Sequence, residues 1–444
     1  MNTREGRLSG EGYGWYVVFV LCVCGVVAFI DRQIINLLVE YIKADLAVSD
    51  TQISLLQGFA FAVFYALVAI PLGRIADSTN RRLLITVGIC AWTMAAICCG
   101  LAQTYAQLFF ARMMVGVGEA VLTPAGFSLL ADFFRPRRLA RPVSVFTASS
   151  FFGSGIALMV GGYIVNAIQA ADGISLPFFG PLRLWQAVFI IGALPGIPAA
   201  IWFFLSVREP PRRSAPSSLQ SSLEYRRGFL EAMRYVGNNR RLFLAIYAGI
   251  SFLAAAQFAL GAWIPAYFIR IHGWSAGDIG YAQGFVFLVC ATIGVVGGGW
   301  LTDAMQARGH RDANLKTSTF GGLLAMPFAV AIPLASDPMV AVALLAPAVM
   351  FGAIPFGGGV AALPMVSPPQ FRAQLVAFYL LVANILGQAG GPWLVAQFTD
   401  RVFADDAAVG WSLMISVPLL LAIGSLLTLS GWRPLRAQLA DASA

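Results

Sequence analysis

The chain has 444 residues, of which 59% are hydrophobic and only 11% are charged, and its mean hydropathy is +0.76. Soluble domains carry about 25% charged residues, so this composition excludes an ordinary soluble protein. The net charge is +8, but the basic residues are scattered over six loops without an aromatic-interleaved patch. This distribution argues against a nucleic-acid partner.

Apolar windows of about 20 residues recur along the whole chain, and each is long enough to cross a hydrocarbon core as a helix. A membrane barrel is excluded because its strands would alternate in segments of about ten residues. We therefore predict an all-α integral membrane protein with twelve transmembrane helices. The predicted helices cover about 15–38, 52–76, 82–102, 105–133, 141–166, 184–206, 241–268, 276–301, 315–336, 339–363, 373–398 and 409–430.

The segment before the first window predicts no cleavable signal peptide. The first fourteen residues are polar and Gly-rich, and the helix that follows is too long for the apolar core of a signal. The cysteines all fall inside predicted helices, which argues against a disulfide framework and against a zinc site. No metal or cofactor is expected. The cysteines are Cys22, Cys24, Cys90, Cys98, Cys99 and Cys290.

The distribution of basic residues predicts the topology. If the N-terminus lies inside, 23 of the 29 Lys and Arg residues fall on the inner face, four on the outer face and two inside helices. The positive-inside rule then places both termini in the cytoplasm. The loops are short and contain no glycosylation sequon, so a bacterial inner membrane is expected.

The longest polar stretch divides the chain into two halves. We predict an N-terminal six-helix half over 1–206, a cytoplasmic linker over 207–240 and a C-terminal six-helix half over 241–444. The second part of the linker has helical spacing of Leu219, Leu223, Leu230 and Met233 among arginines, which predicts an amphipathic helix on the inner leaflet. A partner-binding role for this helix is the alternative.

The two halves repeat a short motif in the loop after their second helix. The first copy is "GRIADSTNRR" (73–82) and the second is "GWLTDAMQARGHR" (299–311). The recurrence at equivalent places indicates an internal repeat.

These motifs resemble the signatures of the major facilitator superfamily over nearly the whole chain. Gly73, Asp77, Arg81 and Arg82 match the loop signature of that family, and its second copy is matched as well. Within the family, "DRQIIN" in helix 1, "RMMVGVGEA" in helix 4 and "LLADFF" after it are similar to the Spinster group. The resemblance implies two six-helix halves related by pseudo-symmetry, and a transporter. Spinster proteins of animals carry lysophospholipids and sphingosine-1-phosphate.

The repeated loop motif predicts a gate on the inner side. Asp77 is expected near the N-terminus of helix 11, around Arg372, where exposed N–H groups carry partial positive charge. Asp303, which with Gly299 forms the second copy, is expected near Arg141 of helix 5. Each such contact contributes about 0.5–2 kcal/mol, which is weak enough for a gate to open. An ordinary solvated turn is the alternative.

Four charges lie well inside the predicted helices: Asp31, Arg32, Arg112 and Glu119. Each costs about 2.5–3.5 kcal/mol at the centre of a membrane, so they must be paired or face water. At 1.5 Å per residue, Asp31 lies roughly 24 Å and Glu119 roughly 21 Å from the inner ends of their helices. Arg112 shares a helix face with Glu119, about 10 Å further out. We therefore place Arg32 beside Glu119, with Arg112 above and Asp31 adjacent.

This arrangement predicts proton coupling through Glu119 and, as a second group, Asp31. Burial disfavours the charged form of Glu119 and a nearby arginine favours it, so withdrawal of the arginine would let it take a proton. An anionic substrate bound by Arg32 and Arg112 could cause that withdrawal. A purely structural ion-pair network is the alternative.

The second half has no charge inside its helices and offers Gln257, Gln283, Asn384 and Gln388. We expect Gln257, Asn384 and Gln388 to contact the substrate. A cavity with one charged and one apolar wall fits an amphipathic anion, such as a lysolipid or a sphingolipid-like molecule. The alternative is a small organic anion, such as a sugar acid or a monocarboxylate.

Other classes of function find little support. The chain has no GxSxG, HExxH or P-loop motif, which argues against an enzyme and against ATP-driven pumping. The loops are too short to display a receptor domain. The expected partners are a lipid or other small-molecule substrate, protons and membrane lipids, and the protein is expected to act as a monomer.

Overall fold

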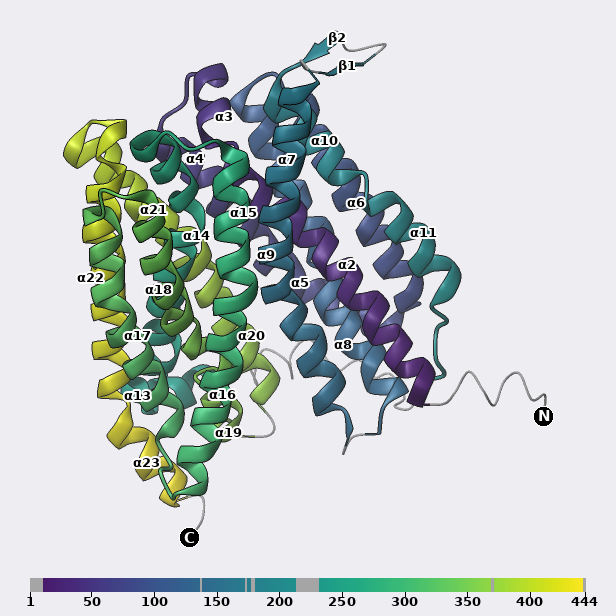
Figure 1. Ribbon diagram of the computed structural model, residues 1–444. Helices are drawn as coiled ribbons and strands as arrows, with labels where there is room; N and C mark the ends of the chain where they lie inside the picture. Colours follow the sequence, from purple (N-terminus) through teal and green to yellow (C-terminus); the bar gives the residue numbers. More distant parts are fainter. Residues whose placement is uncertain are drawn as a thin grey trace. The chain divides into compact units, whose positions relative to one another are not determined.

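The computed structural model describes residues 11–135, 138–171, 174–176, 180–212, 231–368 and 371–441. Within these ranges, twelve helical segments are long and apolar enough to cross a membrane, which confirms the predicted all-α fold of twelve transmembrane helices (Figure 1). Most of the segments are built from two to four consecutive helices rather than one.

The first six spans contain the following helices in chain order: α2 (Glu11–Leu37), which α3 (Val39–Leu46) follows outside the span; α4 (Asp50–Ser54) with η1 (Leu55–Phe59) and α5 (Ala60–Ser78); α6 (Arg81–Leu101); α7 (Tyr105–Glu119) with α8 (Leu122–Phe133); α9 (Ala140–Ala170); and α10 (Leu184–Ala193) with α11 (Gly196–Ser206). A hairpin of two short antiparallel strands, β1 (Ile174–Leu176) and β2 (Gly180–Leu182), joins the fifth span to the sixth.

The last six spans contain these helices: α13 (Arg240–Leu244) with η3 (Ala245–Gly249) and α14 (Ile250–His272); α15 (Ala276–Val286) with η4 (Phe287–Ala291) and α16 (Thr292–Ala307); α17 (Ala313–Ala331) with η5 (Ile332–Leu334); α18 (Pro338–Gly358) with α19 (Ala362–Val366); α20 (Arg372–Val382) with η6 (Ala383–Ala389), α21 (Gly390–Gln397) and η7 (Phe398–Phe403); and η8 (Asp406–Ala408) with α22 (Val409–Ser430) and α23 (Trp432–Asp441).

The chain forms two compact units whose boundaries cut through two of the spans. Unit 1 comprises Met1–Val48, Val63–Ser218 and Ala276–Gly284, and unit 2 comprises Ser49–Ala62, Leu219–Ser275 and Phe285–Ala444. The start of the second span therefore packs with unit 2, and the start of the eighth span packs with unit 1. The predicted division into 1–206, 207–240 and 241–444 stays a prediction.

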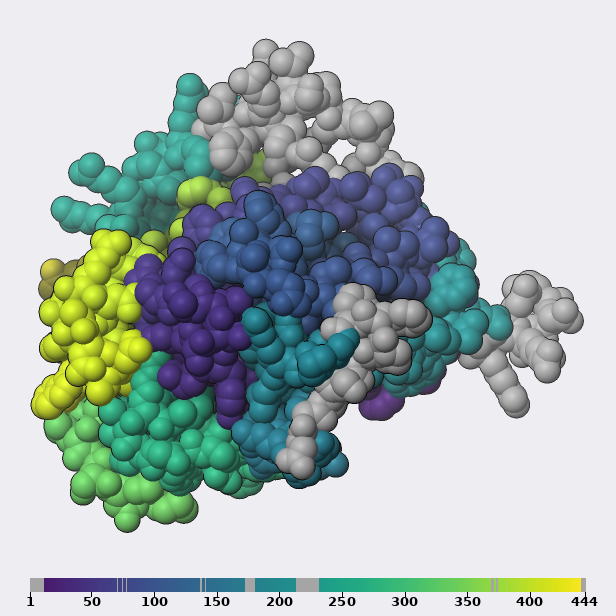
Figure 2. Space-filling model, turned by 90° about the horizontal axis from the view of Figure 1, so that it is seen from above, coloured from purple at the N-terminus to yellow at the C-terminus, as the bar shows by residue number. Residues whose placement is uncertain are grey.

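In unit 1, the long helices α2 and α9 pack along each other through small residues. Gly153 lies against Phe29, and Gly161 lies against Ile34 and Leu37. At one end of this unit, α3 and the β1–β2 hairpin are among the parts visible from above, in purple and teal (Figure 2). Neither the separate α3 helix nor the hairpin was predicted from hydropathy.

In unit 2, glycines bring α16 and α18 into backbone contact. A Cβ atom on Gly294 would lie 2.0 Å from the carbonyl oxygen of Met350, and one on Gly357 would lie 1.9 Å from that of Val295. A side chain of any size is excluded at both positions. Small residues allow helices in a membrane to pack this closely, and the gain is van der Waals contact.

Buried hydroxyl groups bind α17 to its neighbours in unit 2. Thr302 on α16 and Thr317 on α17 share a hydrogen bond of 2.8 Å, and Thr319 on α17 shares one of 2.8 Å with Thr428 on α22. Trp432 Nε1 donates to Thr319 as well, at 3.2 Å. These polar groups of the second half hold helices together, as is common in membranes.

The predicted linker helix falls largely on residues that the structure does not describe. Leu219, Leu223 and Leu230 lie outside the described residues. Residues 231–238, which include Met233, are helical, and Ala232 is buried in the same apolar cluster as Leu435 of α23. All six cysteines are free, in agreement with the prediction of no disulfide.

Candidate functional site

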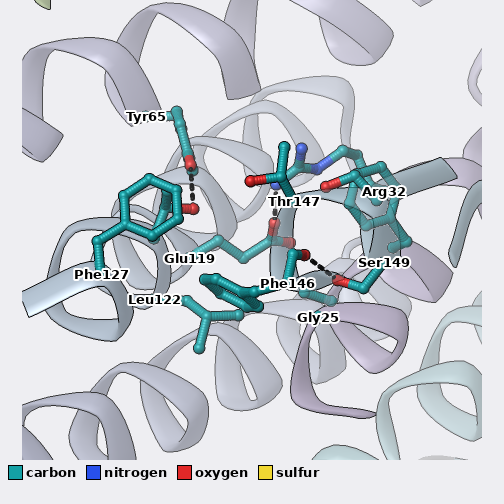
Figure 3. Close-up of a pocket in the computed structure, with 13 residues that line it drawn as sticks. Gly25, Arg32, Tyr65, Glu119, Leu122, Phe127, Phe146, Thr147 and Ser149 are labelled. Carbon is teal, nitrogen blue, oxygen red and sulfur yellow. Dashed lines mark hydrogen bonds and ion pairs between the residues drawn. The ribbon is translucent and has the colours of Figure 1, made fainter. Parts of the chain in front are cut away.

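A buried ion pair joins α2 to the end of α7 in unit 1. Arg32 Nη2 donates a hydrogen bond to Glu119 Oε2 (Figure 3), and the Glu119 side chain is 1% exposed. The depth estimate from the sequence predicted this neighbourhood, although 86 residues separate the two along the chain. The pair is charge-assisted and shielded from solvent, which makes it stronger than a surface ion pair.

Glu119 lies at a break in the fourth span. The helix α7 ends at Glu119, and α8 begins at Leu122. Pro124 has no N–H to donate to the carbonyl of Ala120, four residues before it, so a continuous helix loses that bond here. The result is a turn over Ala120 and Val121, and Glu119 occupies the last helical position before it.

Two aromatic rings hold the guanidinium of Arg32. Its Cζ atom lies 4.6 Å from the centroid of the Phe29 ring and 5.4 Å from that of Tyr65. Cation–π contacts of this kind are worth about 0.5–2 kcal/mol and help to hold the guanidinium in place. The Arg32 side chain is 19% exposed, so an anion can still reach it.

The ion pair forms one end of a pocket in unit 1 with a volume of about 110 Å³. Tyr65 Oη and Thr123 Oγ1 lie 3.2 Å apart across a hydrogen bond, and Ser149 Oγ donates to the Phe146 carbonyl at 2.6 Å. Figure 3 shows Ser149 beside Arg32 and Phe127 on the far side. The pocket combines a cation, hydroxyl groups and aromatic rings. Its lining is Gly25, Ala28, Phe29, Arg32, Tyr65, Glu119, Leu122, Thr123, Phe127, Phe146, Thr147, Ser149 and Ser150.

Asp31 and Arg112 form a second charged pair next to the pocket but outside its lining. Both are buried, at 1% and 0% exposure, and Arg112 Nη1 donates to the backbone carbonyl of Asp31 at 2.8 Å. The carboxylate oxygens of Asp31 accept no hydrogen bond from the part of the chain that the structure describes. The sequence predicted that each buried charge is either paired or faces water, and for Asp31 the structure shows neither a donor to the carboxylate among the described residues nor appreciable exposure. Burial of an isolated carboxylate carries a large desolvation cost.

The three substrate contacts expected from the second half belong to unit 2. Gln257 Nε2 donates to the carbonyl of Val349 at 3.0 Å and so holds α14 to α18. Asn384 Nδ2 donates to Leu380 within its own helix at 2.7 Å, and Gln388 lies in η6. The pocket of unit 1 contains none of them, and their role in binding stays a prediction.

The first copy of the loop motif has buried contacts in unit 1. Arg81, 2% exposed, donates to Asp132 at 2.5 Å, to Glu209 at 2.7 Å and to the carbonyl of Ser128 at 2.9 Å. Arg82 donates through its side chain to the carbonyl of Phe204, at 2.7 Å. These bonds tie the loop to the end of α8 and to the first residues of the linker.

The remaining gate residues give less information. The side chain of Asp77 lies outside the described residues, while Gly73 lies on α5 with Pro124 as its nearest neighbour. In the second copy, a Cβ atom on Gly299 would lie 3.6 Å from the carbonyl oxygen of Gly357, an ordinary contact, and Asp303 is exposed on α16. The gating role of both copies stays a prediction.

Unit 2 contains a charged cluster that sequence reasoning missed. Arg270 donates both of its terminal nitrogens to the Asp50 carboxylate, each at 2.7 Å, and the Asp50 side chain is completely buried. The partners are 220 residues apart, and Arg270 had been assigned only to an outer loop, so no local signal could reveal the pair. Asp50 is the first residue of α4, so its bonds to Arg270 hold the start of the second span within unit 2.

Three carboxylates of this cluster lie within 4.8 Å of one another: Asp50, Asp400 and Asp406. They have the ligand atoms for a cation. However, Arg270 neutralises Asp50, and Asp400 accepts the backbone N–H groups of Asp50 at 3.3 Å and Thr51 at 2.6 Å. These contacts satisfy the charges without an ion.

Comparisons with known proteins agree with this architecture. The family model described as Major Facilitator Superfamily matches residues 21–392. An "MFS-type efflux pump" of Mycolicibacterium smegmatis is 27% identical over 96% of this chain and 94% of its own length. "Protein spinster" of Drosophila melanogaster is 24% identical over 89% of this chain and 64% of its own length.

Two further matches bear on the substrate and on the fold. A "Probable L-galactonate transporter" of Escherichia coli is 24% identical over 74% of this chain and 70% of its own length. The crystal structure of a bacterial homologue of the human lysosomal transporter Spinster superposes with a TM-score of 0.78. It covers 97% of this chain and 99% of its own, at 24% identity.

Proposed function

The chain belongs to the major facilitator superfamily and is a transporter by family, with Spinster proteins among its relatives; on this premise we propose its substrate and its driving force. It moves an amphipathic anion, of the lysolipid or sphingolipid type, by alternating access. Transport is coupled to protons through Glu119. The observation that carries the proposal is the buried Arg32–Glu119 pair at the end of the unit 1 pocket.

The coupling follows from competition for one guanidinium. Glu119 as a carboxylate occupies Arg32 Nη2, the nitrogen that an entering anion also needs. A proton on Glu119 weakens its hold on Arg32, because a charge-assisted hydrogen bond is about twice as strong as a neutral one. Protonation of Glu119 and binding of the anion to Arg32 therefore favour each other. Asp31, buried without a hydrogen-bond donor to its carboxylate among described residues, is the second proton carrier.

The size and lining of the pocket support a substrate with a compact anionic head. The pocket has a volume of about 110 Å³, and the Arg32 guanidinium lies at one end of it. One phosphate or carboxylate group can lie against Arg32, next to the aromatic rings of Phe29 and Phe127. The acyl chain of a lysolipid would lie outside this pocket.

A small sugar acid is the second candidate. The hydroxyl groups of Tyr65, Thr123, Thr147 and Ser149 could bind the hydroxyls of such a substrate, and Arg32 its carboxylate. The relative named as a probable L-galactonate transporter favours this reading.

The distribution of basic residues supports both termini in the cytoplasm, and the short loops without a glycosylation sequon support a bacterial inner membrane. The proton gradient across that membrane would supply the driving force. The inner loop motif around Arg81 and Asp303 would act as the gate of the transport cycle.

A competition experiment separates the two substrate classes. The purified protein is reconstituted into proteoliposomes with an inward proton gradient, and uptake of a labelled lysolipid is titrated with unlabelled lysolipid or with a hexuronate. Arg32→Ala, which removes the guanidinium, serves as the inactive control. Inhibition by lysolipid alone supports the lipid assignment. Inhibition by hexuronate without any lysolipid effect would establish the sugar acid instead.

A further inference from the structure

A basic surface surrounds the C-terminal helix α23 in unit 2. Three segments meet here: residues 231–241, 308–316 and 432–440. Together they contain eight Arg and Lys side chains and two carboxylates. We call these three segments the basic platform. The cations are Arg234, Arg240, Arg241, Arg308, Arg311, Lys316, Arg433 and Arg436.

The helix α23 fastens the three segments together. Leu435 is completely buried in an apolar cluster with Leu242 and Phe243 of α13. Arg436 donates to Asp312 at 2.8 Å, and Arg311 donates to the carbonyl of Leu439 at 3.3 Å. The platform is therefore a fixed part of unit 2, and α23 leaves the end of α22 at an angle (Figure 1).

One carboxylate of the platform is already neutralised. Asp312 is 1% exposed and also accepts a hydrogen bond from Lys316, at 3.1 Å, in addition to that from Arg436. Burial by itself would raise the pKa of Asp312. The hydrogen bonds from Lys316 and Arg436 outweigh burial and hold its pKa below the usual value. Asp312 stays ionised at neutral pH and uses two of the eight cations.

Five other arginines remain exposed. In the part of the chain that the structure describes, they form no ion pair with any carboxylate. Their combined charge is offered to the surroundings of the protein. They are Arg234, Arg240, Arg241, Arg308 and Arg433.

An aromatic anchor lies at the boundary between the platform and the membrane-spanning part. Trp432 is the first residue of α23. The centroid of its ring lies 5.8 Å from that of Phe320, with the two rings tilted, and 5.5 Å from the ammonium nitrogen of Lys316. Tryptophan next to basic residues at the end of a span is typical of the headgroup level of a bilayer. Because Leu435 packs into the protein, it is the exposed arginines of α23 that are available for contact at this level.

We propose that the basic platform binds the headgroups of anionic phospholipids in the leaflet where α23 lies. The chemistry is that of phosphate groups with a net negative charge, which the exposed guanidinium groups contact through charge-assisted hydrogen bonds. This site is separate from the transport pocket of unit 1 and does not depend on the substrate that is carried.

The test uses Trp432 as a local reporter. The full-length protein is reconstituted with phosphatidylcholine in which a fraction is replaced by brominated phosphatidylglycerol or brominated phosphatidylcholine. Bromine quenches nearby tryptophan fluorescence, and the signal of Trp432 is the difference between the wild type and Trp432→Phe. We expect brominated phosphatidylglycerol to quench Trp432 more strongly than brominated phosphatidylcholine does. Each contributing arginine should favour phosphatidylglycerol over phosphatidylcholine next to Trp432 by about fivefold.

Charge variants test whether the platform causes the preference. Replacement of Arg240, Arg241 and Arg433 by Gln should lower the preference by about fivefold for each arginine removed, whereas replacement by Lys should keep most of it. If the Gln triple variant fails to fold, Arg433→Gln alone should lower the preference about fivefold.

The matched control removes two exposed basic residues from unit 1, by Arg135→Gln and Arg141→Gln. This control should leave the preference at Trp432 unchanged. The proposal is overturned if the wild type shows no preference for phosphatidylglycerol, as a surface meant for an acidic protein would. It is also overturned if the Gln variants of the platform keep the wild-type preference, or if the control loses as much as they do.

Discussion

Replacement of Glu119 by glutamine tests the role of its titratable proton without changing the rest of the site. The amide has nearly the same shape as the carboxyl group and can still accept a hydrogen bond from Arg32, but it has no charge and does not titrate. Among the described residues, Glu119 Oε2 accepts a hydrogen bond from Arg32, and Glu119 Oε1 accepts none. The substitution therefore changes little besides the charge.

The magnitude follows from that one hydrogen bond. A hydrogen bond to a charged group contributes about 1.5–3 kcal/mol, and a neutral acceptor retains roughly half of this. An anion that displaces the amide instead of the carboxylate from Arg32 gains the difference, about 0.7–1.5 kcal/mol. Glu119→Gln should therefore bind the anionic substrate about 3- to 13-fold more tightly at neutral pH.

The pH dependence gives the sign of the effect. In the wild type, anion affinity should rise as the pH falls, because protonated Glu119 competes less for Arg32. In Glu119→Gln the affinity should be flat with pH, and uptake driven by a proton gradient should be lost, while exchange of substrate across the membrane persists. Binding is measured with a radiolabelled substrate between pH 5.5 and 8, and transport in proteoliposomes.

A matched control removes another carboxylate of unit 1 that also pairs with an arginine. Asp45 accepts hydrogen bonds from Arg183 and from Trp185 Nε1, at 2.7 Å for the latter, away from the pocket. Asp45→Asn should leave both the pH dependence and the coupling unchanged. If Glu119→Gln transports at the wild-type rate with the wild-type pH dependence, the reasoning on the ion pair is wrong.

Three further predictions concern stability in detergent, measured by thermal unfolding. Asp50→Ala should lower the free energy of unfolding by about 3–5 kcal/mol, because it leaves the 7%-exposed side chain of Arg270 without its carboxylate. The double variant with Arg270→Ala should recover part of this loss. A wild-type melting temperature for Asp50→Ala would contradict the reasoning. Asp312→Asn should lower the free energy of unfolding by about 1–3 kcal/mol at pH 7. Because its folded-state pKa is lowered, the Asp312 contribution is present above about pH 4 and disappears as the pH falls further, so a deficit that persists in acid would refute the assignment. Gly294→Ala should lower the free energy of unfolding by about 1–3 kcal/mol, because its Cβ atom would lie 2.0 Å from a backbone carbonyl oxygen. Gly297→Ala on the same helix, whose Cβ atom would have nothing within 4 Å, should be neutral.

Hydropathy predicted the twelve spans because a membrane imposes the same length and polarity on each of them. It did not predict where a span breaks. The turn after Glu119 depends on Pro124, and the separation of α3 from α2 at Leu38 has no equivalent proline or glycine signal. Breaks of this kind depend on individual backbone hydrogen bonds, and a hydropathy value averaged over a window carries no information about them.

The site was predictable to the extent that depth alone determined it. Counting residues along two antiparallel helices brought Arg32 level with Glu119, because both helices must run the same distance through the membrane. Depth gives no direction around the helix axis, so it could not show that Arg112 points to the Asp31 carbonyl rather than into the pocket. Nor could it find Asp50 and Arg270, which lie at span ends where charges are ordinary.

The interruption of the fourth span also has a mechanical consequence. A continuous helix resists bending, because curvature stretches its backbone hydrogen bonds, and sharp kinks occur where a proline has already removed one. Pro124 removes such a bond at the Ala120 carbonyl, one residue beyond Glu119. The fourth span can therefore flex at the level of its acidic group at little cost in backbone bonding, and small rotations of α7 against α8 would carry Glu119 toward or away from Arg32.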